Sequence, residues 1–312
     1  MTPTPILLPA LAVSALLGLN LLIRKGLAAP RVVETAAPDG LPWETVCIPG
    51  AGGKSLFGWF IPAGPRAPAV AVLHGWGGNA QMMLPLARPL HEAGLALLFF
   101  DARCHGRSDG DSFASLPRFA EDLTCAVNWL QARPEVDARR VGVIGHSVGA
   151  GAALLMASRN PSVAGVVSLA AFAHPATMMR RWLRSMHIPH FPLGSYILWY
   201  VQRTIGRRFD DIAPCHTIGL IHCPVLLVHG TDDQVVPADD ARAIHAGRQS
   251  ERVSLLLLPG GHDDCSELDS VMSEVIDFLN RALAPMSLHP DVQPLAAYPD
   301  VTHAPGEGAH AQ

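Results

Sequence analysis

Short apolar runs alternate with longer mixed segments along most of the chain. The length of the apolar runs is typical of buried strands, and the segments between them have helical spacing. Strands are expected at 44–48, 56–61, 69–73, 95–100, 140–144, 163–169, 224–229 and 253–258, and helices at 81–92, 119–132, 147–158, 238–246 and 267–282. The first two strands read as an antiparallel pair. Strands linked by crossover helices form a mostly parallel sheet covered on both faces, so the pattern predicts an α/β fold with eight strands.

One interval is longer than this alternation requires. About fifty residues separate the strands at 163–169 and 224–229, whereas a single crossover needs roughly 10–12. We expect a helical cap over about residues 174–222, above the carboxyl ends of the strands. Its Met, Trp, Tyr and Arg residues suit an apolar substrate or a membrane interface. They would equally suit a cap that simply packs on the core.

The N-terminal apolar run predicts a membrane segment. Residues 6–23 carry no charge and as a helix would span about 27 Å, close to the roughly 30 Å of a hydrocarbon core. Arg24, Lys25 and Arg31 follow the run, whereas a cleavable signal peptide carries its charges before it. We therefore expect one uncleaved transmembrane helix with the folded domain on the cytoplasmic side. An atypical export signal and an amphipathic docking helix are the alternatives.

The expected organisation is one folded domain with flanking segments. Residues 1–30 form the anchor and its flank, 31–43 a linker, 44–284 the domain with its cap, and 285–312 a Pro- and Ala-rich tail that we expect to be disordered. The chain has 312 residues, 49% of them hydrophobic, which is enough for one large core.

Composition excludes several classes of function. The net charge of −4 and the lack of a basic stripe make nucleic acid an unexpected partner. Gly-rich phosphate-binding patterns are absent, and no helix carries paired histidines at metal-binding spacing, so we expect neither cofactor nor metal. The six cysteines lack Cys-x-x-Cys spacing and are expected to be reduced.

The sequence from Gly145 to Gly149 is the strongest chemical signal. It reads Gly-His-Ser-Val-Gly and joins an expected strand to an expected helix, which is the setting of a nucleophile elbow. The glycines relieve crowding around a strained serine. Ser147 would stand at a helix N-terminus, where N–H groups favour a developing oxyanion. Ser147 is therefore the expected nucleophile.

An acid and a base follow in the order that a serine nucleophile needs. Asp232 and Asp233 come directly after the strand at 224–229, and His262 follows the last strand. The spacing to the following Val-Val-Pro favours Asp233 as the acid, with Asp232 as the alternative. His262 is the expected general base, because the histidine must lie close to the serine elbow.

These motifs resemble the α/β-hydrolase family, in particular its serine esterase, lipase and S33-type peptidase branches. The resemblance covers roughly residues 44–283 and includes two further motifs. Residues 73–79 resemble the oxyanion loop, which implies the N–H groups of Trp76 and Val148 as oxyanion donors. Residues 101–109 resemble the structural turn after the fourth strand, except that Cys104 stands where the family usually has glycine.

Together the motifs predict a membrane-anchored serine hydrolase that cleaves carboxylic esters, with acyl or lipid-like substrates as candidates. The reaction would pass through an acyl-enzyme. A peptidase or a thioesterase on the same fold is an alternative, and so is a protein that keeps the fold only to bind a ligand.

Overall fold

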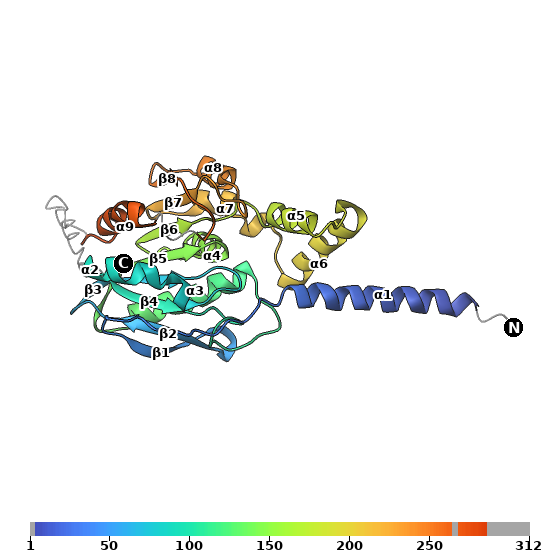
Figure 1. The fold of residues 1–312 in the computed structure, drawn as a ribbon, viewed down its shortest axis with the longest axis horizontal. Helices are drawn as coiled ribbons and strands as arrows, with labels where there is room; N and C mark the ends of the chain where they lie inside the picture. Colours follow the sequence, from blue (N-terminus) through green and yellow to red (C-terminus); the bar gives the residue numbers. More distant parts are fainter. Residues whose placement is uncertain (1–3, 264–267, 286–312) are drawn as a thin grey trace, which may run out of the picture.

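The computed structural model describes residues 4–263 and 268–285, and it contains the predicted α/β architecture (Figure 1). One sheet of eight strands has the order β1-β2-β4-β3-β5-β6-β7-β8. Its strands are β1 (Glu44–Pro49), β2 (Ser55–Ile61), β3 (Ala67–Leu73), β4 (Ala96–Phe100), β5 (Val136–His146), β6 (Gly165–Leu169), β7 (Val225–Gly230) and β8 (Val253–Leu258). The prediction of an eight-stranded, mostly parallel sheet is confirmed.

The register brings the loops that follow several strands to one edge of the sheet. β1 pairs with β2, and β2 with β4, in antiparallel fashion, and every other pairing is parallel. Parallel strands end at the same edge, which is where ligands bind in open α/β sheets. The loops after β3, β5, β7 and β8 therefore meet there.

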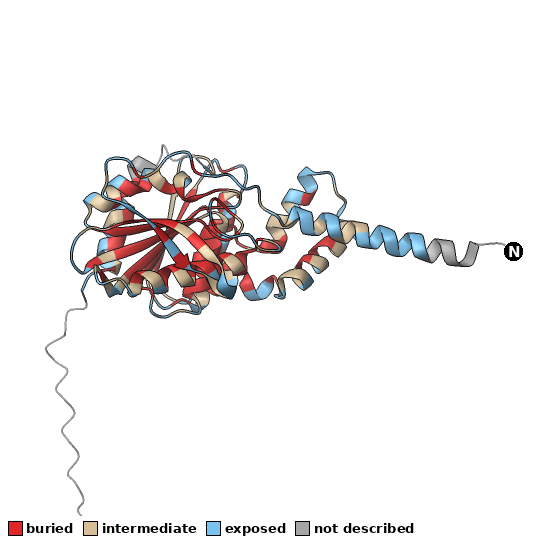
Figure 2. Ribbon diagram, turned by 90° about the horizontal axis from the view of Figure 1, so that it is seen from below, coloured by how far each residue is buried: buried red, intermediate tan, exposed pale blue. Residues whose placement is uncertain are grey.

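Helices cover both faces of the sheet. In the part of the chain that the structure describes, the helices are α1 (Thr4–Gly26), α2 (Ala87–Glu92), α3 (Leu116–Gln131), α4 (Val148–Ala157), α5 (Pro175–Ser185), α6 (Ser195–Ile205), α7 (Pro214–Thr217), α8 (Ala238–Ala246) and α9 (Leu268–Ala282). Buried side chains of α3 and α4 belong to one apolar cluster, and those of α2 and α9 to a second. Figure 2 shows the sheet as the buried centre between these layers.

One expected helix differs from the prediction. The segment 81–92 begins as a 3₁₀-helix, Ala80–Leu86, and becomes α-helical only as α2. Pro85 lies inside the first part. Proline has no N–H and its ring clashes with the carbonyl four residues earlier, so the first turns cannot form regular α-helix.

The expected cap is present between β6 and β7. α5, a π-helical turn at His190–Gly194, and α6 stand beside the main domain in Figure 1. The apolar residues of the cap divide into two groups. Leu183, Ile197, Leu198 and Val201 are buried with the core, whereas Trp182, Met186, Phe191 and Trp199 are exposed. Core packing therefore accounts for only part of the cap's apolar surface.

α1 extends away from the domain and is held to the cap at its C-terminal half (Figure 1). Tyr196 donates a hydrogen bond to Asn20, at 2.7 Å, and Arg24 donates one to the Tyr200 hydroxyl, at 2.9 Å. The predicted transmembrane span is not confirmed. The structure describes side chains from residue 10 onwards. Within these described residues, no helix is long and apolar enough to cross a membrane. The tail expected to be disordered lies almost wholly outside the described residues.

Candidate active site

Ser147 stands on a strained turn between β5 and α4. Its backbone angles are φ 53° and ψ −115°. This conformation is strained for any residue that has a side chain, and the strain costs free energy. A Cβ at Gly145 would overlap the main chain of Gly149, and one at Gly149 would come within 2.8 Å of the Leu73 oxygen. The two glycines therefore allow the turn, as the sequence pattern predicts.

The structure brings Ser147, His262 and Asp233 together in one hydrogen-bonded chain. The Nε2 atom of His262 lies 3.0 Å from Ser147 Oγ, and its Nδ1 atom lies 2.7 Å from Asp233 Oδ2. A carboxylate can only accept, so Nδ1 carries the proton and Nε2 is left to accept the hydroxyl hydrogen. This arrangement can remove a proton from a serine that attacks a carbonyl carbon.

Asp233, rather than Asp232, is the carboxylate that meets His262. The other oxygen of Asp233, Oδ1, accepts the N–H groups of Val235 and Val236, at 2.8 and 2.7 Å. Asp232 instead accepts the N–H of Gly260 at 3.1 Å. The expected assignment therefore agrees with the geometry, and Asp232 shapes the neighbouring loop.

The Asp233 carboxylate is held in its ionised form. Burial alone would raise its pKa, but hydrogen bonds from His229, His262 and the Val236 N–H outweigh burial and hold the pKa of Asp233 well below its usual range. An ionised Asp233 can stabilise the imidazolium that forms when His262 takes a proton.

Sequence reasoning did not single out His229 near the end of β7. This residue is buried, and its Nε2 atom lies 2.7 Å from the Val236 oxygen and 3.3 Å from Asp233 Oδ2. The His229 side chain therefore holds the turn that carries Asp233, and the positive end of its N–H dipole lies near the Asp233 carboxylate. The only signal in the sequence is its position four residues before Asp233, at the end of a strand.

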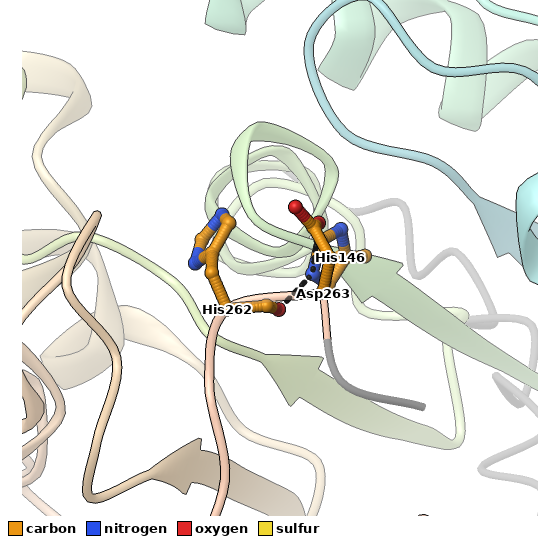
Figure 3. A group of neighbouring side chains, drawn as sticks. All are labelled: His146, His262 and Asp263. Atoms are coloured by element: carbon orange, nitrogen blue, oxygen red, sulfur yellow. Dashed lines mark hydrogen bonds and ion pairs between the residues drawn. The ribbon is translucent and has the colours of Figure 1, made fainter. Parts of the chain in front are cut away.

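His146 has a structural role that its place in the elbow only partly suggests. Its Nε2 atom donates a hydrogen bond to the main-chain oxygen of His262, at 2.9 Å (Figure 3). Burial is the main cause that lowers the pKa of His146, which favours the neutral ring, and the bond to the His262 oxygen places the proton of that ring on Nε2. Asp263 lies on the same side, 3.7 Å from Nε2.

The expected oxyanion donors adjoin Ser147. Val148 is the first residue of α4, where N–H groups have no partner within the helix. On the other side, a Cβ at Gly75 would lie 3.2 Å from the Ser147 Cβ, so the loop that carries Trp76 passes close to the nucleophile. The next N–H, that of Gly77, is fixed by His105 Nε2 at 3.1 Å. The positions of both residues are thus compatible with the expected oxyanion donors.

The loops beneath the site are tied by buried neutral histidines. His74 accepts the N–H of Ala102 at 3.1 Å, and burial is the main cause that lowers the pKa of His74 to about 3. Burial also lowers the pKa of His105. Cys104 adopts φ 70° in the turn, where the resemblance leads one to expect glycine, and its Sγ accepts the Asp111 N–H at 3.2 Å. The turn therefore forms despite the side chain.

A cavity of about 630 Å³ opens onto Ser147 and His262. Its wall combines residues of the core with residues of the cap and of the segment that follows α1. Apolar side chains dominate it, and they include Leu27, Met82, Met83, Leu116, Phe172, Met178, Met179, Trp182, Val201, Ile205 and Phe209. Apart from histidines, Asp263 is the only acidic or basic side chain among the described residues that line the cavity. The cavity is therefore suited to an uncharged, apolar group.

In the part of the chain that the structure describes, two groups of side chains are close enough together to be considered as metal ligands. One is His146, His262 and Asp263, and it overlaps the candidate catalytic set. The other is His174, Asp210 and His216 at the base of the cap. His174 Nδ1 accepts the Ala176 N–H, so its Nε2 carries the proton that it donates to Asp210. This nitrogen has no lone pair for a metal, and the second group is better described as the N-terminal cap of α5.

Comparison with known families and proteins places the chain among enzymes of one fold. Residues 64–199 match the family model described as serine aminopeptidase, S33. An uncharacterised protein of Mycobacterium tuberculosis is 32% identical over 235 residues, which are 74% of this chain and 75% of that protein. The uncharacterised protein YfhR of Escherichia coli K12 is 28% identical over 262 residues, 80% of this chain and 85% of YfhR.

Solved structures share the architecture at lower identity. The esterase Pf2001 of Pyrococcus furiosus superposes with a TM-score of 0.69 and 23% identity, covering 82% of this chain and 97% of that one. Est1E of Butyrivibrio proteoclasticus gives a TM-score of 0.60 and 19% identity, covering 77% of this chain and 99% of that one. These similarities concern the fold.

Proposed function

Because the chain belongs to the α/β-hydrolase family, we propose that this hydrolase is a serine hydrolase that cleaves carboxylic esters. The observation that carries the proposal is the hydrogen-bonded chain from Ser147 Oγ through His262 to Asp233. A fold hosts many activities, so the argument rests on these side chains and on the cavity they face.

The proposed reaction has two steps. Ser147 Oγ attacks the ester carbonyl while His262 Nε2 takes its proton, and the Trp76 and Val148 N–H groups stabilise the oxyanion. His262 returns the proton to the leaving alcohol, which departs and leaves an acyl-enzyme on Ser147. Water then attacks the acyl group with His262 as general base, and the acid product leaves. Asp233 keeps the imidazole in the required tautomer throughout.

The cavity favours an ester with an apolar acyl group. Its volume of about 630 Å³ falls in the usual range for sites that bind small organic molecules. A charged acyl group would find no lysine or arginine among the described lining residues. A peptidase is the second candidate, supported by the family model of serine aminopeptidases. An aminopeptidase needs a partner for the substrate ammonium group, and Asp263 is the lining residue that could supply one.

We also propose that α1 attaches the enzyme to a membrane, with the hydrolase domain on the cytoplasmic side. The support is a set of leucine side chains of α1 that the protein leaves exposed: Leu11, Leu16, Leu17, Leu21 and Leu22. Arg24 and Lys25 follow them. A reporter fused to the C-terminus should be active in the cytoplasm and should sediment with membranes. An external or freely soluble reporter would refute the attachment or its orientation.

A fluorophosphonate probe tests the proposed activity. The purified protein should be labelled covalently, and Ser147→Ala should abolish labelling because the nucleophilic oxygen is gone. Ser112→Ala, which removes an exposed hydroxyl from another loop, is the matched control and should be labelled like the wild type. Equal labelling after Ser147→Ala would refute the proposal. A folded wild-type protein that resists the probe would favour the ligand-binding alternative.

The substrate class needs a second experiment. p-Nitrophenyl esters, the matching thioesters and aminoacyl p-nitroanilides should be compared at equal concentration. We expect the highest kcat/KM for the esters. Higher kcat/KM for the anilides would instead assign the protein to the peptidases.

A further inference from the structure

A segment between α1 and β1 lies across the loop that carries Trp76. We call residues 27–38 the strap, and we extend the oxyanion loop of residues 73–79 by two residues, so that from here on it covers 73–81. The side chain of Asn79 in this loop donates a hydrogen bond to the Val32 oxygen of the strap, at 3.0 Å. Asn79 is itself buried, so its side chain is held in place between the loop and the strap.

Two further contacts join the strap to the loop. Gln81 Oε1 accepts the N–H groups of Thr35 and Ala36, at 2.6 and 3.0 Å. Gly77 passes so close to Pro30 that a Cβ at Gly77 would lie 2.9 Å from the proline ring. The segment predicted as a simple linker is therefore docked on the oxyanion loop.

The strap also places a carboxyl group in the protein interior. Glu34 is 5% exposed, and its side chain has no exposed area. Isolated buried carboxylates are costly, so such a group needs a partner or a proton. The Nε atom of Arg107 lies 3.3 Å from Glu34 Oε2, but the Arg107 side chain is half exposed and therefore compensates the charge only in part.

The partner of Glu34 is a second buried carboxyl, that of Asp101. Neither oxygen of the Glu34 carboxyl accepts a hydrogen bond from a donor group among the described residues, although the Asp101 carboxyl lies beside it. A Cβ at Gly106, whose φ is +43°, would overlap both Asp101 Oδ2 and Glu34 Oε1, which shows how close the two oxygens are and why glycine occupies this position. A carboxyl–carboxyl hydrogen bond requires one proton between the two groups.

Asp101 connects this pair to the oxyanion loop. Its Oδ1 atom accepts the N–H of Ala80, at 2.8 Å, and its Oδ2 atom accepts the N–H of Arg107, also at 2.8 Å. Ala80 is buried at the C-terminal end of the loop. Asp101 is therefore hydrogen-bonded to the segment that presents Trp76 on one side and adjoins the Glu34 carboxyl of the strap on the other.

We propose that Glu34 is a positioning residue of the oxyanion loop, and that the proton it shares with Asp101 keeps the strap docked so that the Trp76 N–H faces Ser147. This inference rests on the proposed function for its kinetic consequences. The docking of the strap itself can be measured whether or not the protein is a hydrolase.

Protonation gives this contact a pH dependence with a defined sign. Burial first, and then the hydrogen bond with Glu34, raise the pKa of Asp101 to about 8. Folding raises the pKa of such a carboxyl above the pKa that it has in the unfolded chain. Its contribution to the free energy of unfolding is then fully present below the unfolded-state pKa, and it is lost as the pH rises to the pKa of the folded state. Above about pH 8 the pair carries a second negative charge. Strap docking should therefore weaken on the alkaline side.

Other charged or titratable groups lie on the elements around the pair. Arg107 and His105 belong to the turn after β4, His74 to the end of β3, and Arg31 to the strap. Burial, and the charge of Arg31, lower the pKa of His105, while burial and His105 lower that of His74. These histidines are thus neutral on the alkaline side and cannot account for a loss there. Arg107, whose Nε atom lies 3.3 Å from Glu34 Oε2, is a positive charge that opposes the second negative charge at every pH of the test.

Glu34→Gln and Glu34→Ala test the proposal as a pair. The amide of Gln has a donor N–H and can donate to an ionised Asp101, so the pair carries no second negative charge on the alkaline side. Glu34→Gln should have nearly wild-type kcat at neutral pH and should lack the alkaline loss of activity. Glu34→Ala should lower kcat by at least about 10-fold with a smaller change in KM, because the oxyanion donor is misplaced.

The measurements are kcat and KM for p-nitrophenyl butyrate from about pH 6 to about pH 9.5, the range over which the Asp101 carboxyl should titrate. Wild-type kcat should fall on the alkaline side. A kcat of Glu34→Ala within twofold of wild type, or an unchanged alkaline loss in Glu34→Gln, would overturn the proposal. If Glu34→Ala fails to fold, the pH profile of Glu34→Gln still decides.

Hydrogen exchange separates this inference from the proposed function. Amides of residues 32–36 should be protected in wild type at neutral pH, less protected on the alkaline side, and protected at both pH values in Glu34→Gln. If the wild-type protein is catalytically inactive but shows this exchange pattern, the proposed activity fails and the docking stands. If activity is normal and exchange is the same in all variants, the role of Glu34 fails.

Discussion

The ring of His146 donates a hydrogen bond to the main-chain oxygen of His262, so the residue before Ser147 holds the loop of the expected base. His146 is the last residue of β5 and His262 lies in the loop after β8, so the bond of 2.9 Å joins two segments that are far apart in the sequence. It connects the His262 loop directly to the elbow that carries Ser147, whose Oγ atom lies 3.0 Å from His262 Nε2. A catalytic set on loops needs such support.

Replacing His146 should therefore lower activity without removing a catalytic group. We expect His146→Ala to reduce kcat about 10-fold, since a small misplacement of a base is enough for that loss. His146→Gln keeps an N–H that can donate to the His262 oxygen and should recover most of the activity. Steady-state kinetics on p-nitrophenyl butyrate, with circular dichroism as a check of folding, measure both. Equal losses in the two variants would show that the hydrogen bond is not the reason.

Asp233 and Asp232 should differ strongly on substitution. Asp233→Asn removes the acceptor that fixes the His262 tautomer and should lower kcat by roughly 10³- to 10⁴-fold. Asp232→Asn should stay within about 10-fold of wild type, because Asp232 accepts only loop hydrogen bonds and an amide oxygen can replace it. The two single variants are matched controls for each other. A larger loss at Asp232 would reverse the assignment of the acid.

Asp233 should also make the free energy of unfolding depend on pH in the acid range. Its pKa is held below the usual range in the folded protein, so its hydrogen bonds stabilise the fold above the ordinary pKa of about 4 and this contribution is lost as pH falls below that value. Wild type should be more stable than Asp233→Asn at neutral pH. The difference in free energy of unfolding, measured by urea denaturation, should shrink as pH falls below about 4. A difference that stays constant with pH would contradict the cited hydrogen bonds as its cause.

The cap wall of the cavity should control the length of the acyl group. Met178 of α5 lines the cavity, and Met178→Trp would fill part of its volume. We expect kcat/KM for p-nitrophenyl octanoate to fall about 10-fold or more, since a buried overlap costs roughly 1–3 kcal/mol. Activity on the acetate should change much less, because a short acyl group does not reach the wall. Equal losses on both esters would place the acyl group elsewhere.

Much of the fold follows from local pattern. Buried parallel strands are continuous apolar runs, so their number and approximate bounds could be found without any tertiary information. The strand that ends in His146 is longer than expected because its first half, from Val136, contains charged residues that hide the pattern. The start of the helix near Ala80 was misjudged for a local reason too, since Pro85 excludes regular α-helix there.

The expected site residues could be named because each directly follows a strand. Parallel strands end at the same edge, so Ser147, Asp233 and His262 had to converge once the strand order was right. The choice between Asp232 and Asp233 is harder, because both follow the same strand and only the directions of their side chains distinguish them. It depends on two main-chain N–H groups, of Val235 and Val236, that turn the Asp233 carboxylate towards His262.

The strap marks the limit of what the sequence could show. Glu34 lies in a segment rich in Pro, Gly and Ala that reads as a flexible linker, and nothing in its spacing distinguishes it from an exposed carboxylate. It is buried because the chain crosses the turn that contains Asp101, and the two residues are far apart in sequence. Partners of this kind are set by the path of the chain in three dimensions.

The amino-acid sequence by itself determined the strands, the cap insertion and the types and order of the expected catalytic residues, because apolar runs and glycine turns act over a few neighbouring residues. Only the tertiary structure decided which carboxylate meets His262, which histidines hold the loops, and that a linker residue is buried against Asp101. These choices depend on distances between residues remote in the chain. Such distances are fixed only when the sheet, the cap and the strap pack together.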